Sequence, residues 1–284
     1  MKKPLLYICL ILITSNGCAQ TKQTSDQVQS AAATDSATNF SLTRFIAGEY
    51  SLFNVDILDN LYLLTAGKQL KKFNASGDSV SVYNDVKNYG IPTSLDVTNP
   101  FKILLYYKNF STLVVLDRQL SLRNSINLRK LGIFSTKTIA TAYDNNIWLF
   151  DEQSFKLKKI NEEGETLMET ADWRMLYDEV PVPSTLIDHN DLVYLYDPEK
   201  GFYIFDYYGA PKNHLPFLNW QNIAVSADYL YGFKEDSLLS YRLQSLSLNQ
   251  LRLPDALKQA ISLKAMNGKL YVLKNEGLYI YKIQ

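Results

Sequence analysis

Cysteine and histidine are scarce in this sequence, which has two of each among 284 residues. A metal cage, a Ser-His-Asp triad and a disulfide framework all need those residue types. An excess of one charge is lacking too, because 29 Lys and Arg residues balance 29 Asp and Glu residues. Nucleic-acid surfaces depend on clustered Lys and Arg, so we predict no nucleic-acid partner. We also predict no catalytic residue, no metal site and no cofactor.

The N-terminus carries the pattern of an export signal. Lys2 and Lys3 precede an uncharged apolar run, Leu5 to Ile13, which is followed by small and polar residues up to Cys18. A charged segment, a short apolar segment and a cleavage region define a secretory signal peptide. The apolar run has only about half of the ~20 residues that a membrane-spanning helix needs. We therefore predict that residues 1–17 are a signal peptide that is removed.

A cysteine directly after a glycine at the end of such a run resembles the lipobox of bacterial lipoproteins. The resemblance implies that Cys18 becomes the lipidated first residue of the mature chain and anchors it in a membrane. Ala19 follows it, which by the same resemblance implies an outer-membrane lipoprotein of the cell envelope, and we expect it to face the periplasm. Residues 18–39 are rich in Gln, Ser, Thr and Ala and are predicted to be a flexible tether. An ordinary secretory peptide with an incidental Cys18 is the alternative.

A repeat of about 40 residues runs through the rest of the chain. Its first element is a short apolar, aromatic-rich segment that occurs six times. These segments begin at Leu61, Ile103, Ile147, Val193, Leu230 and Leu270, so successive starts are 42, 44, 46, 37 and 40 residues apart. A second apolar segment follows 8 to 10 residues after each start. Asn, Asp and Gly between the segments supply the residues that tight hairpin turns need.

This period predicts the fold. Units near 40 residues with several short strands each are typical of β-propeller blades. The segments are filled with Tyr, Phe, Ile, Val and Trp, which favour strands over the helix pairs of a solenoid. We therefore predict an all-β protein, a six-bladed β-propeller formed by residues 40–284. The last unit supplies only three strands, so we predict that Phe40 to Ile46 adds the fourth and closes the ring.

Two units, from Pro92 to Asp117 and from Pro183 to Gly209, share an order of features. Each has a Pro before the inner strand, an Asp or Asn turn, an apolar strand and a third strand that ends near Asp or Gly. This order resembles the NHL and TolB-like group of six-bladed propellers. The resemblance is weaker in the other units, but it extends from Phe53 to Gln284. The resemblance implies the same fold. It implies no particular partner, because the Gly-Asn cores typical of NHL repeats are missing.

The connections from each outer strand to the next inner strand are rich in aromatic residues and arginine. In a propeller these connections all lie on one face, so such residues suggest a surface for a partner. The candidate partner-binding residues are Tyr89, Arg129, Trp173, Arg174, Tyr177 and Trp220. We expect Trp173, Arg174 and Trp220 to be partly exposed and close together. The alternative is that the rings plug the mouth of the channel or wedge between blades.

Two functions fit this organisation. The first is a membrane-tethered periplasmic binding or scaffold module for a protein or a cell-envelope polymer, without enzymatic activity. The second is a hydrolase or lyase that depends on a divalent cation, similar to lactonase-type propellers, which would need acidic side chains around the channel. The acidic candidates are Asp56, Asp85, Asp96, Asp178, Glu179 and Asp188. We expect Asp56 and Asp96 at equivalent positions of inner strands, which a polar channel also explains.

Overall fold

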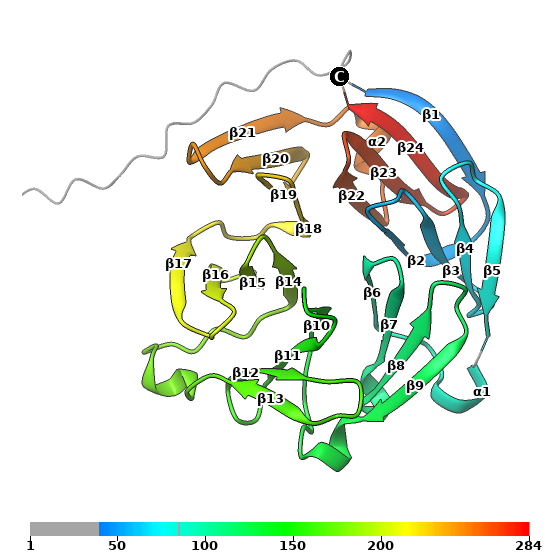
Figure 1. Ribbon diagram of the computed structural model, residues 1–284. Coiled ribbons are helices and arrows are strands. Elements are labelled where there is room, and N and C mark those ends of the chain that lie inside the picture. Colours follow the sequence, from blue (N-terminus) through cyan, green and yellow to red (C-terminus); the bar gives the residue numbers. More distant parts are fainter. Residues whose placement is uncertain (1–39, 85, 284) are drawn as a thin grey trace, which may run out of the picture. The chain divides into compact units, whose positions relative to one another are not determined.

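Six four-stranded antiparallel sheets make up the propeller (Figure 1). The computed structural model describes residues 40–84 and 86–283; Cys18, the predicted signal peptide and the predicted tether lie outside the described residues. Strands dominate the described part, which has only two short α-helices, α1 (Val86–Tyr89) and α2 (Asp255–Lys258). Neither of these helices is long and apolar enough to cross a membrane. The predicted all-β, six-bladed propeller is confirmed.

Each blade has four strands, counted here outward from the centre of the ring, and blades 1 to 6 follow the order of their inner strands. The inner strands are β2 (Tyr50–Val55), β6 (Ser94–Asn99), β10 (Ile139–Thr141), β14 (Thr185–His189), β18 (Gln221–Ser226) and β22 (Ser262–Met266). The second strands are β3 (Leu61–Thr65), β7 (Lys102–Tyr107), β11 (Ile147–Asp151), β15 (Leu192–Asp197), β19 (Tyr229–Lys234) and β23 (Lys269–Lys274). The third strands are β4 (Leu70–Phe73), β8 (Thr112–Asp117), β12 (Lys156–Ile160), β16 (Gly201–Asp206), β20 (Ser237–Arg242) and β24 (Gly277–Ile283). The outer strands are β5 (Ser79–Tyr83), β9 (Leu122–Asn127), β13 (Thr166–Glu169), β17 (Pro211–Leu215), β21 (Ser247–Arg252) and β1 (Phe40–Ala47).

Blade 6 combines strands from both ends of the propeller sequence. β1 pairs with β24 in an antiparallel ladder that runs from Phe40 opposite Ile283 to Ala47 opposite Gly277. The sheet order is therefore β1-β24-β23-β22, and Figure 1 shows β1 (blue) lying along β24 (red). β1 covers the edge that β24 would otherwise expose. The closing strand predicted from the sequence is confirmed.

The core lies between neighbouring blades. Side chains alternate across a strand, so a sheet that is covered on both faces needs apolar residues at successive positions. In β7, Ile103 and Leu105 belong to a cluster with Tyr62 of blade 1. Leu104 and Tyr106 point the other way, into a cluster with residues of blade 3. The apolar runs that define the repeat are therefore the second strands, which are buried on both faces.

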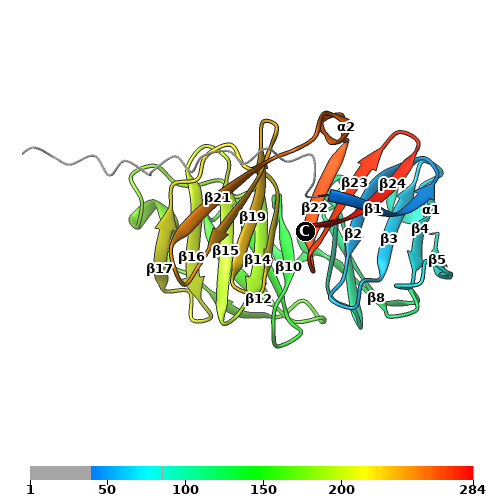
Figure 2. The same ribbon diagram turned by 90° about the horizontal axis from the view of Figure 1, so that it is seen from above.

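Hydrogen bonds also join each pair of neighbouring blades. In order around the ring they link Asn54 Nδ2 to the Leu95 carbonyl (2.7 Å), Asn99 Nδ2 to Asn145 Oδ1 (2.6 Å), Trp148 Nε1 to Asp188 Oδ2 (2.9 Å), His189 Nε2 to the Ala227 carbonyl (2.8 Å), Ser262 Oγ to Asn222 Oδ1 (3.0 Å) and Lys269 Nζ to Asp59 Oδ2 (2.8 Å). Figure 2 shows the blades side by side, with the connection through α2 at one rim of the ring. The ring is thus bridged by polar contacts as well as by apolar packing.

Candidate functional site

The sequence-predicted binding residues lie on the connections between outer strands and the next inner strands. These connections are residues 48–49, 84–93, 128–138, 170–184, 216–220 and 253–261. Successive strands of a blade run in opposite directions, so the turns between second and third strands lie on the same side of the ring. We call this side the connection face. It comprises these connections and the turns 66–69, 108–111, 152–155, 198–200, 235–236 and 275–276.

The two tryptophans of the connection face are buried, which corrects the expectation that they are partly exposed. The side chain of Trp173 is 0% exposed and stacks on Phe205 with ring centroids 5.0 Å apart. Trp220 is 4% exposed and stacks on Phe217 at 4.8 Å. The two rings belong to separate core clusters, so they are not neighbours either. Trp173 packs between blades 3 and 4, and Trp220 packs between blades 4 and 5. This is the alternative considered above, in which the rings wedge between blades.

The other four candidates are spread over three connections and form no common patch. Tyr89 is half-buried beside Tyr107, and Tyr177 is half-buried with its ring edge-on to Trp173. Arg174 is more than half exposed and forms an ion pair of 2.5 Å with Asp172. Arg129 is exposed, and it is discussed below because of its neighbours.

The connection face does expose apolar side chains, but they are a different set. Phe134 is 57% exposed and Met175 is 84% exposed. The exposed apolar residues of this face are Ile91, Phe110, Leu131, Phe134, Met175, Leu176, Val182, Leu218 and Ile261. None of them is among the candidate residues: the sequence places Phe134 on a connection but does not single it out, and aliphatic residues in a connection do not reveal which way they point. The predicted face therefore carries apolar surface, although not at the predicted residues.

A cleft of about 290 Å³ lies among these residues, between the turn of blade 2 and the connection to blade 3. We call it the basic cleft; its lining includes Lys108, Arg129 and Phe134. Arg129 is held against the wall of the cleft, because its Nε donates to Ser111 Oγ (3.1 Å) and its Nη2 to the Asn109 carbonyl (3.4 Å). Among the described residues, neither Lys108 nor Arg129 has a carboxylate within ion-pair distance. The cleft therefore presents two cations beside an exposed aromatic ring.

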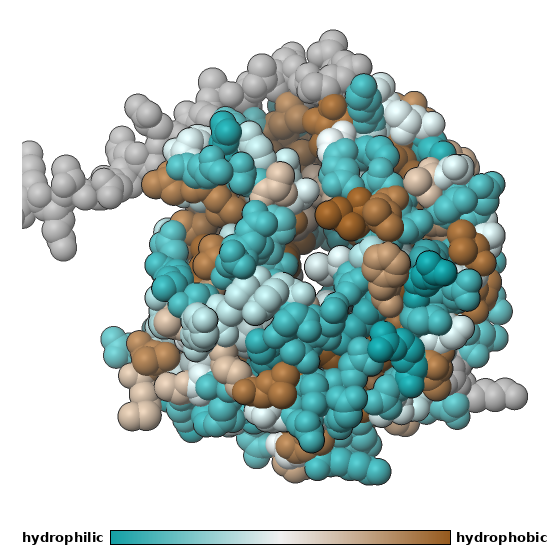
Figure 3. All heavy atoms as spheres, viewed as in Figure 1, coloured by the Kyte–Doolittle hydropathy of each residue, from teal (hydrophilic) through white to brown (hydrophobic). Residues whose placement is uncertain are grey.

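The second candidate site is the central channel, which appears as a hollow in the middle of the ring (Figure 3). A cavity of about 340 Å³ is lined by inner-strand residues of all six blades. Strand pairing defines one equivalent position in each blade, which we call the channel ring. Its members are Asn54, Asp96, Ala140, Ile187, Ala224 and Lys264. Three consecutive blades, 6, 1 and 2, supply the polar members, and the other three supply apolar ones, of which Ala140 is packed in the core between blades 3 and 4 and does not line the cavity.

This register corrects one expectation about the acidic residues. Asn54 pairs with Tyr62 as Asp96 pairs with Leu104, so Asn54 and not Asp56 is the equivalent of Asp96. Asp56 lies in the turn after β2, where it is fully buried. Its two oxygens accept four hydrogen bonds from the turn and from Tyr62. Asp56 therefore shapes the turn.

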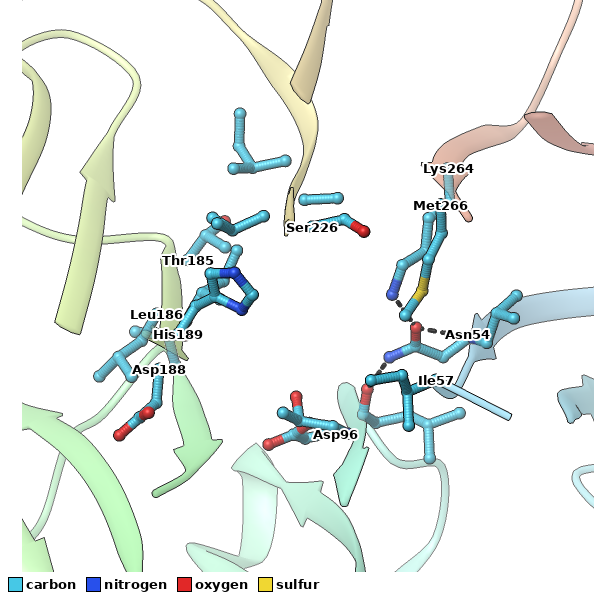
Figure 4. Close-up of a pocket in the computed structure, with 18 of the residues that line it drawn as sticks. Asn54, Ile57, Asp96, Thr185, Leu186, Asp188, His189, Ser226, Lys264 and Met266 are labelled. Atoms are coloured by element: carbon cyan, nitrogen blue, oxygen red, sulfur yellow. Dashed lines mark hydrogen bonds between the residues drawn. The ribbon is translucent and has the colours of Figure 1, made fainter. Parts of the chain in front are cut away.

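Lys264 is the cation of the channel ring. Its ammonium group donates to Asn54 Oδ1, whose own amide donates to the Leu95 carbonyl, and Figure 4 shows Lys264 and Asn54 pointing toward one another. Burial lowers the pKa of Lys264 to about 8, although the nearby carboxylates of Asp96 and Asp56 act in the opposite direction. The sequence offered no signal for this residue until the six inner strands were placed in register.

The remaining acidic candidates do not come together at one site. Asp188 accepts hydrogen bonds from Trp148, Tyr207 and the Tyr143 amide, and burial raises its pKa. Asp178 and Glu179 are exposed on the connection face, and Asp85 lies outside the described residues. Within residues 40–84 and 86–283, no group of three or more His, Cys, Asp or Glu side chains is placed to hold a metal ion.

The fold places the chain among the six-bladed β-propellers, and comparison with solved structures agrees. Virginiamycin B lyase from Staphylococcus aureus with quinupristin superposes with a TM-score of 0.58, 13% identity, and coverage of 86% of this chain and 89% of that one. The Pan2 WD40 domain from Neurospora crassa superposes with a TM-score of 0.62 and 10% identity, and the match covers 88% of this chain and 97% of that one. PorZ, a surface component of the type-IX secretion system of Porphyromonas gingivalis, superposes with a TM-score of 0.53 and 14% identity. The match covers 86% of this chain and 32% of PorZ. No protein-family model and no curated protein sequence matches the chain. These likenesses show the fold alone.

Proposed function

We propose that this protein is a membrane-tethered binding or scaffold module of the cell envelope, and that its connection face holds an acidic protein partner. One observation carries the proposal: exposed apolar side chains gather on that face beside a cleft with two cations that lack carboxylate partners among the described residues. Exposed apolar surface marks interaction sites, and aromatic rings with arginine are typical of their energetic centres. Complementary charge would add orientation and speed of association.

The tether, the periplasmic location and the lipid anchor at Cys18 belong to this proposal and rest on the sequence pattern alone. A rigid ring suits a scaffold, because its blades are bridged all the way round and a partner would meet preformed loops. The fold is shared with PorZ, a surface component of a secretion system, which agrees with a role in envelope assembly. A cell-envelope polymer is the alternative partner.

The test is capture of partners from detergent-solubilised envelopes by the purified propeller, followed by mass spectrometry. We expect the double variant Arg129→Glu, Phe134→Ser to lose most of the captured partner, because it reverses one charge and removes one exposed ring of the basic cleft. Its melting temperature should stay close to that of the wild type, since both side chains are exposed.

A matched control changes the same residue types elsewhere. Arg118→Glu, Phe101→Ser alters exposed residues in turns on the opposite side of the ring and should capture normally. Equal loss of capture by both double variants would contradict the proposed face. Capture that survives protease treatment of the envelope extract would identify a polymer as the partner instead.

A further inference from the structure

Lys264 has spare hydrogen-bonding capacity inside a cavity. A lysine ammonium carries three N–H donors, and among the described residues only Asn54 Oδ1 receives one of them. No carboxylate of the described residues forms an ion pair with Lys264. Asp96 and Asp56 lie near enough to favour its charged form, but a half-buried ammonium with unused donors costs stability, so its position in a cavity suits an anionic ligand.

The carboxylates near Lys264 are already engaged. The two oxygens of Asp96 accept the amides of Thr98 and Thr141, and those of Asp56 accept four donors from its own turn and Tyr62. Across the channel, Asp188 is held by three donors of blades 3 and 4. Because Lys264 itself lines the cavity, a ligand there can accept its unused donors.

The opposite side of the channel mixes aliphatic with polar side chains, and the polar ones include Thr185, Asp188, His189 and Ser226. Blades 3 to 5 contribute a set of aliphatic side chains to the lining: Ile139, Leu186, Ile187, Ile223, Ala224 and Val225. Figure 4 shows Leu186 on the side of the cavity opposite Lys264 and Asn54. A volume of about 340 Å³ lies within the range of small-molecule sites. The channel thus offers one cationic contact and, across from it, aliphatic side chains interspersed with polar ones.

We propose that the central channel binds a small amphipathic carboxylate, whose charged end is held by Lys264 and Asn54 and whose hydrocarbon part lies against the aliphatic side chains of blades 3 to 5. This site is independent of the connection face. The Asn54 amide and the Lys264 ammonium set the orientation, because they lie in adjacent blades on the same side. These aliphatic side chains supply the burial that favours a hydrocarbon chain over water.

Affinity should depend on the protonation of Lys264. A pKa of about 8 still leaves the ammonium mostly charged at neutral pH, so anion binding should be strong below pH 8 and weaken as the pH rises through about 8. The other titratable groups that face the cavity or lie close to Lys264 are Asp56, Asp96, Asp188 and His189. They remain in a Lys264→Met variant, which therefore isolates the contribution of Lys264 to the pH profile.

The test is calorimetric titration of the purified propeller with octanoate, and with octylammonium as the probe of opposite charge. We expect octanoate to bind and octylammonium not to bind. Lys264→Met should weaken octanoate binding by roughly tenfold or more, the effect of losing a charged hydrogen bond, and should remove the fall in affinity near pH 8. Lys264→Arg should retain binding, because it keeps the charge.

Lys234→Met, a change at an exposed lysine of β19 outside the channel, is the matched control and should bind octanoate normally. Each of three results would overturn the proposal: no octanoate binding by the wild type, equal binding of octylammonium, or unchanged affinity in a folded Lys264→Met variant. Melting curves of all variants establish that they are folded.

Discussion

Trp173 and Arg174 show how adjacent residues of one connection take opposite roles. Asp172 begins a single 3₁₀ turn, and its Oδ1 accepts the Arg174 amide at 2.9 Å. The turn directs Trp173 inward against Phe205, where its Nε1 donates to Thr170 Oγ1. Arg174 points outward to solvent and Asp172. One residue therefore belongs to the core and its neighbour to the surface.

We expect Trp173→Ala to destabilise the propeller by about 3–5 kcal/mol, because it leaves a large cavity between blades 3 and 4. Urea unfolding, followed by far-ultraviolet circular dichroism, measures the change. Met175→Ala, two residues further along and almost fully exposed, should change the free energy of unfolding by less than about 0.5 kcal/mol. Similar stability of the two variants would show that Trp173 is not a core residue.

The direction of individual side chains is what the sequence did not reveal. Trp173 and Trp220 could be placed on the correct connections from the repeat, but a ring in a loop has the same sequence signature whether it faces a blade or solvent. Lys264 lies between Leu263 and Ala265 in an alternating strand, which is ordinary for an inner strand. Its role becomes visible only when strand pairing aligns it with Asn54 and Asp96.

At the scale of elements, the sequence predicted the strands correctly where burial requires a recognisable pattern of apolar residues. The second strands are covered on both faces, so each is an apolar run that repeats with the blade. Strand ends are less constrained. β2 ends at Val55, whereas β6 continues to Asn99, and this difference explains why Asp56 was wrongly aligned with Asp96.

The closing strand gives the element-scale prediction. A chain that begins at residue 48 lacks β1, so blade 6 loses a ladder of backbone hydrogen bonds worth about 1 kcal/mol each. We expect it to be less stable by more than about 3 kcal/mol than a chain that begins at residue 40, which keeps β1 whole. Thermal and urea unfolding of the two chains provide the comparison. An unchanged unfolding midpoint would show that blade 6 does not need its outer strand.

At the scale of the whole molecule, the sequence pattern around Cys18 makes a prediction about location. We expect Cys18→Ala to remain unlipidated, and therefore to leave the membrane fraction or to accumulate as unprocessed precursor. Cell fractionation with immunoblotting, and metabolic labelling with a palmitate analogue, measure both outcomes. A Ser15→Ala variant, which keeps Cys18, is the control and should fractionate like the wild type. Mature Cys18→Ala protein in the membrane fraction would contradict lipid anchoring.

The pairing of β1 with β24 also has a consequence for the order of folding. β1 is the first strand of the propeller to leave the ribosome, yet its partner is the last, so it waits unpaired while the five intervening blades are synthesised. Closing so long a segment carries a large entropic cost and slows folding. Until β24 arrives, the edge of the incomplete ring can pair with other chains. A chain that is exported before it folds would have both strands available at once, and its ring could then close without this delay.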